Sequence, residues 1–111
     1  MDVYVVILQQ ELIGKVWNGR HSVLAVFDTY ENAKKSIDNL IKDSERSYDN
    51  HDGGFKVTKE NPIEEDLGTI LVVSQGECVR DINIVTYFGN NHYRYRFYIK
   101  GETVRTLVED K

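Results

Sequence analysis

Residues 22–49, SVLAVFDTYENAKKSIDNLIKDSERSYD, decide the fold because the pattern changes there from strand to helix. Ser22 to Phe27 is apolar and rich in β-branched residues, which favours a strand. Asp28 or Thr29 can then cap a helix, since both side chains accept hydrogen bonds from the first helical N–H groups. The following apolar spacing predicts one helix from Tyr30 to about Asp49. Its core-facing side chains are Ala33, Ile37, Leu40, Ile41, Ser44 and Tyr48.

Strand-forming segments flank this helix on both sides. Before it, Val3 to Gln9 and Ser22 to Phe27 are connected through Asn18-Gly19, a pair that favours a hairpin turn. After it come five apolar or β-branched segments: Phe55 to Lys59, Thr69 to Ser74, Cys78 to Phe88, His92 to Ile99 and Thr103 to Val108. The last four have short connections, including a turn at Lys100-Gly101-Glu102, which force antiparallel pairing. The sequence therefore predicts a single α+β domain over residues 1–111, in which an antiparallel sheet (N-terminal hairpin plus C-terminal meander) packs against one long α-helix.

The segment Val3 to Leu8 is apolar at both sets of alternating positions, and Ile70 to Val73 repeats this pattern. Both faces of such a strand need cover. One amphipathic helix covers only one face of a sheet, so the other face must meet a curled part of the same sheet or a second copy. We expect a homodimer or a higher homo-oligomer, with closure of the sheet as the alternative.

Composition limits the classes of function. The chain has 111 residues, with 14 Lys and Arg against 18 Asp and Glu, and its net charge of -4 argues against duplex DNA as a partner. The longest apolar run is only Val3 to Leu8, and the N-terminus lacks the layout of a signal peptide. We therefore expect a cytoplasmic protein without a membrane partner. The single cysteine, Cys78, excludes an internal disulfide.

The best candidate for ligand binding is the basic and aromatic strand near the C-terminus. Alternation places Arg94, Arg96 and Tyr98 on one face of that strand. Two guanidiniums beside a phenol could hold a phosphate or carboxylate and stack on a ring, which would suit an anionic, nucleotide-like ligand. The alternative is an outward polar face whose arginines pair with acidic residues across the sheet.

A second candidate surface would bind a protein partner. Glu64, Glu65 and Asp66 lie in an acidic loop that could meet a basic surface, and Trp17 beside Arg20 lies near a hairpin tip, where aromatic side chains are often exposed for binding. The alternatives are a solvated acidic loop and a tryptophan packed on the helix or on a second copy.

Signals for catalysis are poor. Cys78 could pair in space with His21 or His92, but neither combination lies in a recognisable motif. Asp49, His51 and Asp52 offer three possible metal ligands just after the helix, although a solvent-exposed helix end explains them better. We therefore expect no catalytic residue, metal or cofactor. A small hydrolase or nucleotide-modifying enzyme using Cys78 and a histidine is the alternative.

The segments VYVVIL, LAVFDT and YENAKKSI, all between Val3 and Ile41, resemble small uncharacterised proteins of bacteria and their phages. The resemblance transfers no site residue, but it implies a context. Small, acidic phage proteins without enzymatic motifs often block a host protein or sequester a signalling molecule. The hypothesis is a non-enzymatic inhibitor that serves phage counter-defence or host takeover.

Overall fold

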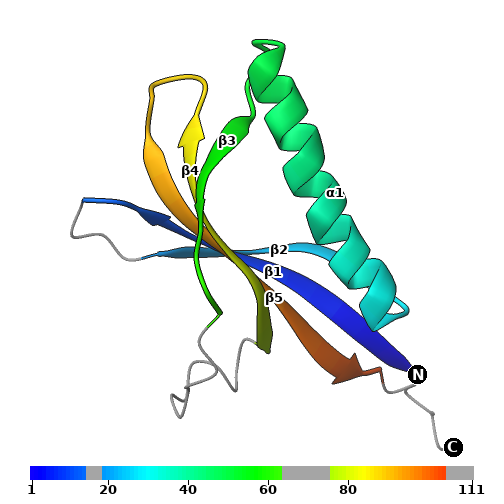
Figure 1. Ribbon diagram of the computed structural model, residues 1–111. Coiled ribbons are helices and arrows are strands. Elements are labelled where there is room, and N and C mark those ends of the chain that lie inside the picture. Colours follow the sequence, from blue (N-terminus) through cyan, green and yellow to red (C-terminus); the bar gives the residue numbers. More distant parts are fainter. Residues whose placement is uncertain (15–18, 64–75, 105–111) are drawn as a thin grey trace, which may run out of the picture.

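The computed structural model describes residues 1–14, 19–63 and 76–104. Five antiparallel strands form one sheet in the order β2-β1-β5-β4-β3, joined by a single helix, which confirms the predicted α+β class (Figure 1). The elements are β1 (Asp2–Leu12), β2 (Arg20–Phe27), α1 (Tyr30–Asp49), β3 (Phe55–Glu60), β4 (Glu77–Thr86) and β5 (His92–Thr103). The sheet is strongly twisted, so the strands at its two edges cross at a wide angle.

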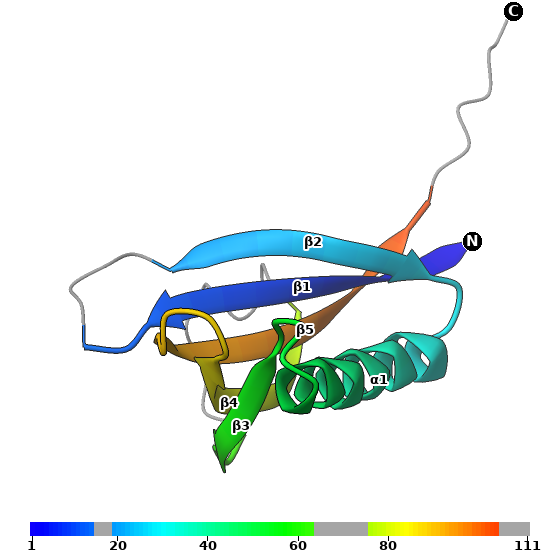
Figure 2. The same cartoon turned by 90° about the horizontal axis from the view of Figure 1, so that it is seen from above.

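The core lies between the helix and one face of the sheet, which we call the near face (Figure 2). Ala33, Ile37 and Ile41 of α1 are buried there, as the helical spacing predicted. The predicted place of Leu40 in the core is wrong, because Leu40 is 37% exposed. The sheet contributes alternate residues of its central strands: Val6, Leu8, Ile82, Ile84, Phe97 and Ile99. Because side chains alternate between faces along a strand, the residues between these point away from the helix, to what we call the far face.

Local capping explains where α1 begins and ends, and at its C-terminal end the backbone N–H of the C-cap residue Asn50 donates to the Arg46 carbonyl. Thr29 is the N-cap, and its hydroxyl accepts a hydrogen bond from the Asn32 N–H at 3.1 Å. Asp28 instead accepts a hydrogen bond from the Asn32 side chain. After the helix the chain turns through Gly54, whose φ of +82° suits glycine and whose Cα lies so close to α1 that a Cβ would approach the Ser44 carbonyl oxygen within 2.2 Å.

The predicted turn at Lys100-Gly101-Glu102 is wrong, because β5 continues through these residues to Thr103. The reason is a partner distant in sequence: β1 pairs along the whole of β5, with Asp2 opposite Thr103 and Leu12 opposite Tyr93. This pairing joins the N-terminal hairpin and the C-terminal meander into one sheet. The predicted strand at Thr69 to Ser74 and most of the one at Thr103 to Val108 lie outside the described residues.

Candidate functional site

The far face of the sheet has an apolar half, formed by β1 and β2. Val5 lies opposite Val26 and Ile7 lies opposite Val23, and directly paired residues point to the same face. Val23 and Val26 are 65% and 56% exposed, which is high for valine on a sheet. Together with Val3, these residues form what we call the apolar half of the far face.

The polar half of the far face lies further along β1 and extends across β5 to β4. Gln9 and Glu11 of β1 lie opposite Arg96 and Arg94 of β5. On the other side of β5, Asp81 and Asn83 of β4 lie opposite the same two arginines. This half is therefore a polar network that spans three neighbouring strands.

Asp81 is the centre of that network. Among the charged residues that the structure describes, Asp81 is the one that is buried, with 5% of its surface exposed. Arg94 donates from Nε and Nη2 to the two carboxylate oxygens at 2.8 and 2.6 Å, and the Asn61 amide donates to Oδ1 at 3.1 Å. Burial by itself would raise the pKa of Asp81, but the hydrogen bonds from Arg94 and Asn61, together with the positive charges of Arg94 and Arg96, outweigh burial and hold the pKa below its ordinary value. The carboxylate is therefore charged in the folded protein at neutral pH.

Arg96 and Tyr98 also have partners within the chain. Arg96 Nη1 lies 3.3 Å from Glu11 Oε1, and its Nε lies 3.5 Å from Asp81 Oδ2. The Tyr98 hydroxyl donates to the Gln9 side chain at 3.0 Å, and Tyr98 is only 7% exposed. The structure thus brings all three predicted ligand-binding residues to one face, where two guanidiniums already balance two carboxylates.

The sheet register separates Cys78 from both candidate histidines. Cys78 lies opposite Tyr98 whereas His92 lies opposite Val85, so the two are about 20 Å apart at ~3.4 Å per residue. His21 lies on β2, three strand spacings from β4, or about 14 Å. The Cys78 thiol donates to the Arg80 carbonyl, and burial, followed by the charge of Asp81, raises its pKa to about 11. A thiol in this state is protonated at neutral pH.

The residues just after α1 form an aromatic cluster. His51 Nδ1 is hydrogen-bonded to the Tyr87 hydroxyl, and the two rings are 4.8 Å apart. Tyr48 and Phe88 contact the same tyrosine ring edge-on. Within the described ranges, no group of three acidic, histidine or cysteine side chains could hold a metal ion. Sequence reasoning missed this cluster, because nothing in Tyr87-Phe88 indicates that it meets the helix end.

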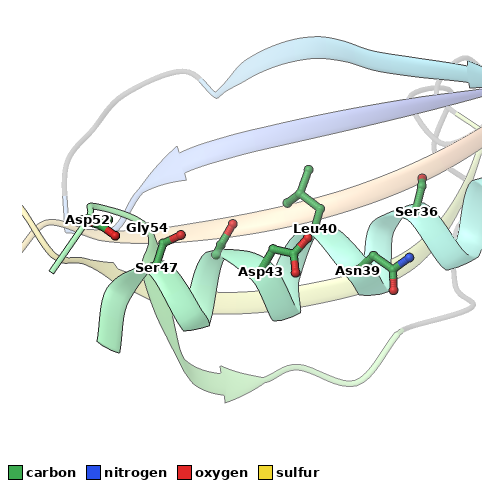
Figure 3. Close-up of a pocket in the computed structure, with 8 residues that line it drawn as sticks. Ser36, Asn39, Leu40, Asp43, Ser47, Asp52 and Gly54 are labelled. Atoms are coloured by element: carbon green, nitrogen blue, oxygen red, sulfur yellow. The ribbon is translucent and has the colours of Figure 1, made fainter. Parts of the chain in front are cut away.

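A shallow groove of about 650 Å³ lies beside the C-terminal half of α1 (Figure 3). It is lined by Ser36, Asn39, Leu40, Asp43, Ser44, Ser47, Asp52 and Gly54. Its two charged side chains, Asp43 and Asp52, are carboxylates, so the groove disfavours an anionic ligand. It is lined by side chains of α1 and by Asp52 and Gly54 just after the helix, and neither Arg94 nor Arg96 lines it.

Of the predicted partner-binding residues, Arg20 is exposed at the start of β2. Trp17, Glu64, Glu65 and Asp66 lie outside the described residues. Nothing in the described chain therefore places the predicted acidic loop relative to the sheet.

These features define a small α+β protein in which a single helix covers one face of an antiparallel sheet and a half-apolar face lies opposite. None of the described helices is long and apolar enough to cross a membrane. No protein-family model, curated protein or solved structure matches the chain.

Proposed function

We propose that this protein is a non-enzymatic binding protein that occludes a protein partner through the apolar half of its far face. The observation that carries the proposal is the exposure of Val23 and Val26, at 65% and 56%, beside the half-buried Val3, Val5 and Ile7. Scattered exposed apolar side chains are ordinary, but contiguous ones on a rigid sheet are typical of protein interfaces.

The distribution of charge favours a protein partner over an anionic nucleotide. A phosphate would have to compete with Asp81 for Arg94 and with Glu11 for Arg96. Asp81 is buried and holds Arg94 through two short hydrogen bonds, so displacing it would leave a buried charge without its partner. Capture of a nucleotide at Arg94, Arg96 and Tyr98 is therefore the weaker form of the binding proposal.

Turnover by Cys78 is the least supported function. A nucleophilic cysteine needs a base within hydrogen-bond reach and a lowered pKa. Cys78 has a pKa raised to about 11, and the register holds both candidate histidines well beyond hydrogen-bond reach.

The biological role that we attach to this binding activity is phage counter-defence or host takeover by blocking a host protein. Its support is the N-terminal resemblance to small bacterial and phage proteins. An apolar face that binds a protein fits a blocking mechanism better than a catalytic one, because occlusion requires affinity and no chemistry.

The experiment is affinity capture from a bacterial lysate with three baits: the wild type, Val5→Glu and Ile63→Glu. Val5 lies on the apolar half opposite Lys100, which pairs with Glu102 at 2.8 Å. A glutamate at position 5 would face this lysine and share it with Glu102, so the sheet should persist. Ile63 is 47% exposed beyond the end of β3 and serves as the matched control. We expect the wild type and Ile63→Glu to retain the same protein and Val5→Glu to lose it.

A parallel measurement tests the nucleotide form. Equilibrium dialysis against ATP and against inorganic pyrophosphate should show no saturable binding to the wild type. Saturable binding that is lost in Arg94→Gln/Arg96→Gln, together with capture unaffected by Val5→Glu, would contradict the proposal and favour ligand sequestration.

A further inference from the structure

The strand β2 forms one edge of the sheet and has no charged residue between Arg20 and its end at Phe27. Edge strands expose unpaired backbone N–H and C=O groups, and most proteins protect such an edge with lysine, proline or other charged residues. β3, at the other edge, follows this rule, since Lys56, Lys59 and Glu60 make up half of its six residues. β2 is therefore an edge whose composition permits pairing with another strand.

We infer that β2 pairs with β2 of a second copy of this chain, antiparallel and about a two-fold axis, so that one continuous sheet runs through both copies. A two-fold pairing requires a self-complementary strand. The segment HSVLAVF meets this requirement, because it places no like charges opposite each other in any antiparallel register.

The faces of β2 narrow the register. The pairing with β1 shifts near Leu24, so that Val23 and Val26 both lie on the far face although they are three residues apart. Residues paired across an antiparallel ladder point to the same face. A register that pairs Val23 with Val26 of the second copy therefore keeps far-face residues together and near-face residues together. In the same register, Ser22 meets Phe27 of the second copy on the near face.

Charge complementarity at the ends of the strand supports the second copy as the occupant. Antiparallel pairing brings the Arg20 end of one β2 to the Phe27 end of the other, where Asp28 follows. Arg20 is exposed, and no carboxylate of the described residues lies within ion-pair distance of it. Asp28 is also exposed. In the register that pairs Val23 with Val26, Asp28 lies opposite His21 of the second copy and one position away from Arg20, so the two-fold axis places the Asp28 and Arg20 charges near each other twice.

The edge pairing goes beyond the proposed function, because it uses the backbone edge of β2 and leaves the far face uncovered. It places the two apolar halves side by side, which enlarges the surface that a protein partner would contact. The test below needs no partner, so the two proposals can fail separately.

The experiment is sedimentation equilibrium of the purified chain and of three double variants, each checked for folding by circular dichroism. Val23→Lys/Val26→Lys and Val23→Glu/Val26→Glu place like charges opposite each other twice across the axis. Each of these two β2 variants should raise the dimer dissociation constant at least about 30-fold. Lys56→Gln/Lys59→Gln on β3 lowers the net charge by the same amount as the glutamate variant of β2 and should leave the dissociation constant unchanged.

Mixing the lysine and glutamate variants in equal amounts gives the decisive result. We expect a mixed dimer, because Lys and Glu then face each other across the axis, and its recovery also shows that both variants are folded. The inference is overturned by a monomeric wild type at micromolar concentrations, by a dimer that the β2 variants leave unchanged, or by a mixture that stays monomeric. A monomeric wild type that still captures a partner, with capture lost in Val5→Glu, would overturn the edge pairing and leave the proposed function standing.

Discussion

The two edge strands of the sheet, β3 and β2, differ in charge and in their contacts with the rest of the molecule. β3 carries charge along its length and is attached to the rest of the molecule by side chains: Arg80 contacts Glu60 at 2.8 Å and Asp38 of α1 at 2.8 Å. Asn61, just after β3, donates to both Asp81 and Asn83 of β4. β2 is uncharged between its ends and exposes Val23 and Val26. One edge strand is therefore charged and held to β4 and α1 by polar side chains, while the other is uncharged between its ends and presents exposed valines.

The largest expected effect comes from separating β3 from the helix. In Gly54→Ala the new methyl group would lie 2.2 Å from the Ser44 carbonyl oxygen, at a φ of +82° that disfavours alanine. We expect a loss of more than about 3 kcal/mol in the free energy of unfolding, measured by urea denaturation. Gly14→Ala is the matched control, because Gly14 also has positive φ but no atom within 4 Å of the added carbon. Equal losses in the two variants would contradict the close approach of the chain to α1.

Asp81→Asn should weaken the polar network that connects Asp81 of β4 to Arg94 and Arg96 of β5 and to Asn61 just after β3. Both guanidiniums would then face a neutral amide, and we expect a loss of about 3 kcal/mol, at the low end for a buried pair because Arg94 and Arg96 are partly exposed. Amide hydrogen exchange should accelerate more in β3 and β4 than in β2. Asp2→Asn, at an exposed carboxylate, should change stability by less than about 0.5 kcal/mol. Uniform acceleration across all strands would argue against a local network.

Lowering the pH should remove the stabilisation that the Asp81 charge contributes to the wild type, as Asp81→Asn does. The pKa of Asp81 is lowered in the folded protein, so its contribution is present above the unfolded value of about 3.9 and is lost as the pH falls through the folded value below it. Urea midpoints of the wild type and Asp81→Asn should therefore converge as the pH drops from about 5 to below about 4. A difference that stays constant with pH would mean that the charge of Asp81 contributes nothing.

Arg80→Met should weaken the attachment of β3 by a smaller amount. The partners Glu60 and Asp38 are about half exposed, so we expect a loss of about 1 kcal/mol that shrinks at high salt. Arg46→Met is the control, since Arg46 lies 4.0 Å from Asp43 and both side chains are well exposed. If the two arginines prove equivalent in urea denaturation at low and high salt, the Arg80 bridge does not stabilise the edge.

Alkylation of Cys78 should show the smallest effect. With a pKa of about 11, the thiol in the folded protein should react with iodoacetamide at least about tenfold more slowly at pH 7.5 than in the urea-unfolded chain. The same shift predicts that stability falls as the pH rises from about 9 to about 11, because the unfolded state loses the thiol proton first. Rapid labelling of the folded protein at pH 7.5 would restore Cys78 as a candidate nucleophile.

The helix was predictable because its signals are local. The cap at Thr29 and the spacing of Ala33, Ile37 and Ile41 indicate its bounds without knowledge of any other element. The β4–β5 hairpin was predictable for the same reason, since a short turn determines the pairs that follow it. The same register continues without a shift from Val85 opposite His92 to Asp81 opposite Arg96, so the turn alone indicates that pair as well.

Long-range pairing was not predictable in this way. The ladder between β1 and β5 joins residues that are 81 to 101 positions apart, from Leu12 opposite Tyr93 to Asp2 opposite Thr103. Gly101 has a turn signal, but its pairing with Tyr4 overrides that signal. The register shifts near Leu24 and Val79 depend on neighbouring strands and leave no mark in the sequence. The contrast between the charged edge strand β3 and the uncharged edge strand β2 is therefore evident only once the strand order is known.

A native mass spectrum of the protein purified from cells shows whether β2 is the edge through which two copies of the chain pair. Edge pairing through β2 predicts a species of twice the 12.9 kDa chain mass that carries no additional mass, and this species should dissociate in Val23→Lys/Val26→Lys. A species of single-chain mass would contradict the edge pairing. Added mass of nucleotide size would contradict the preference for a protein partner and return attention to Arg94 and Arg96.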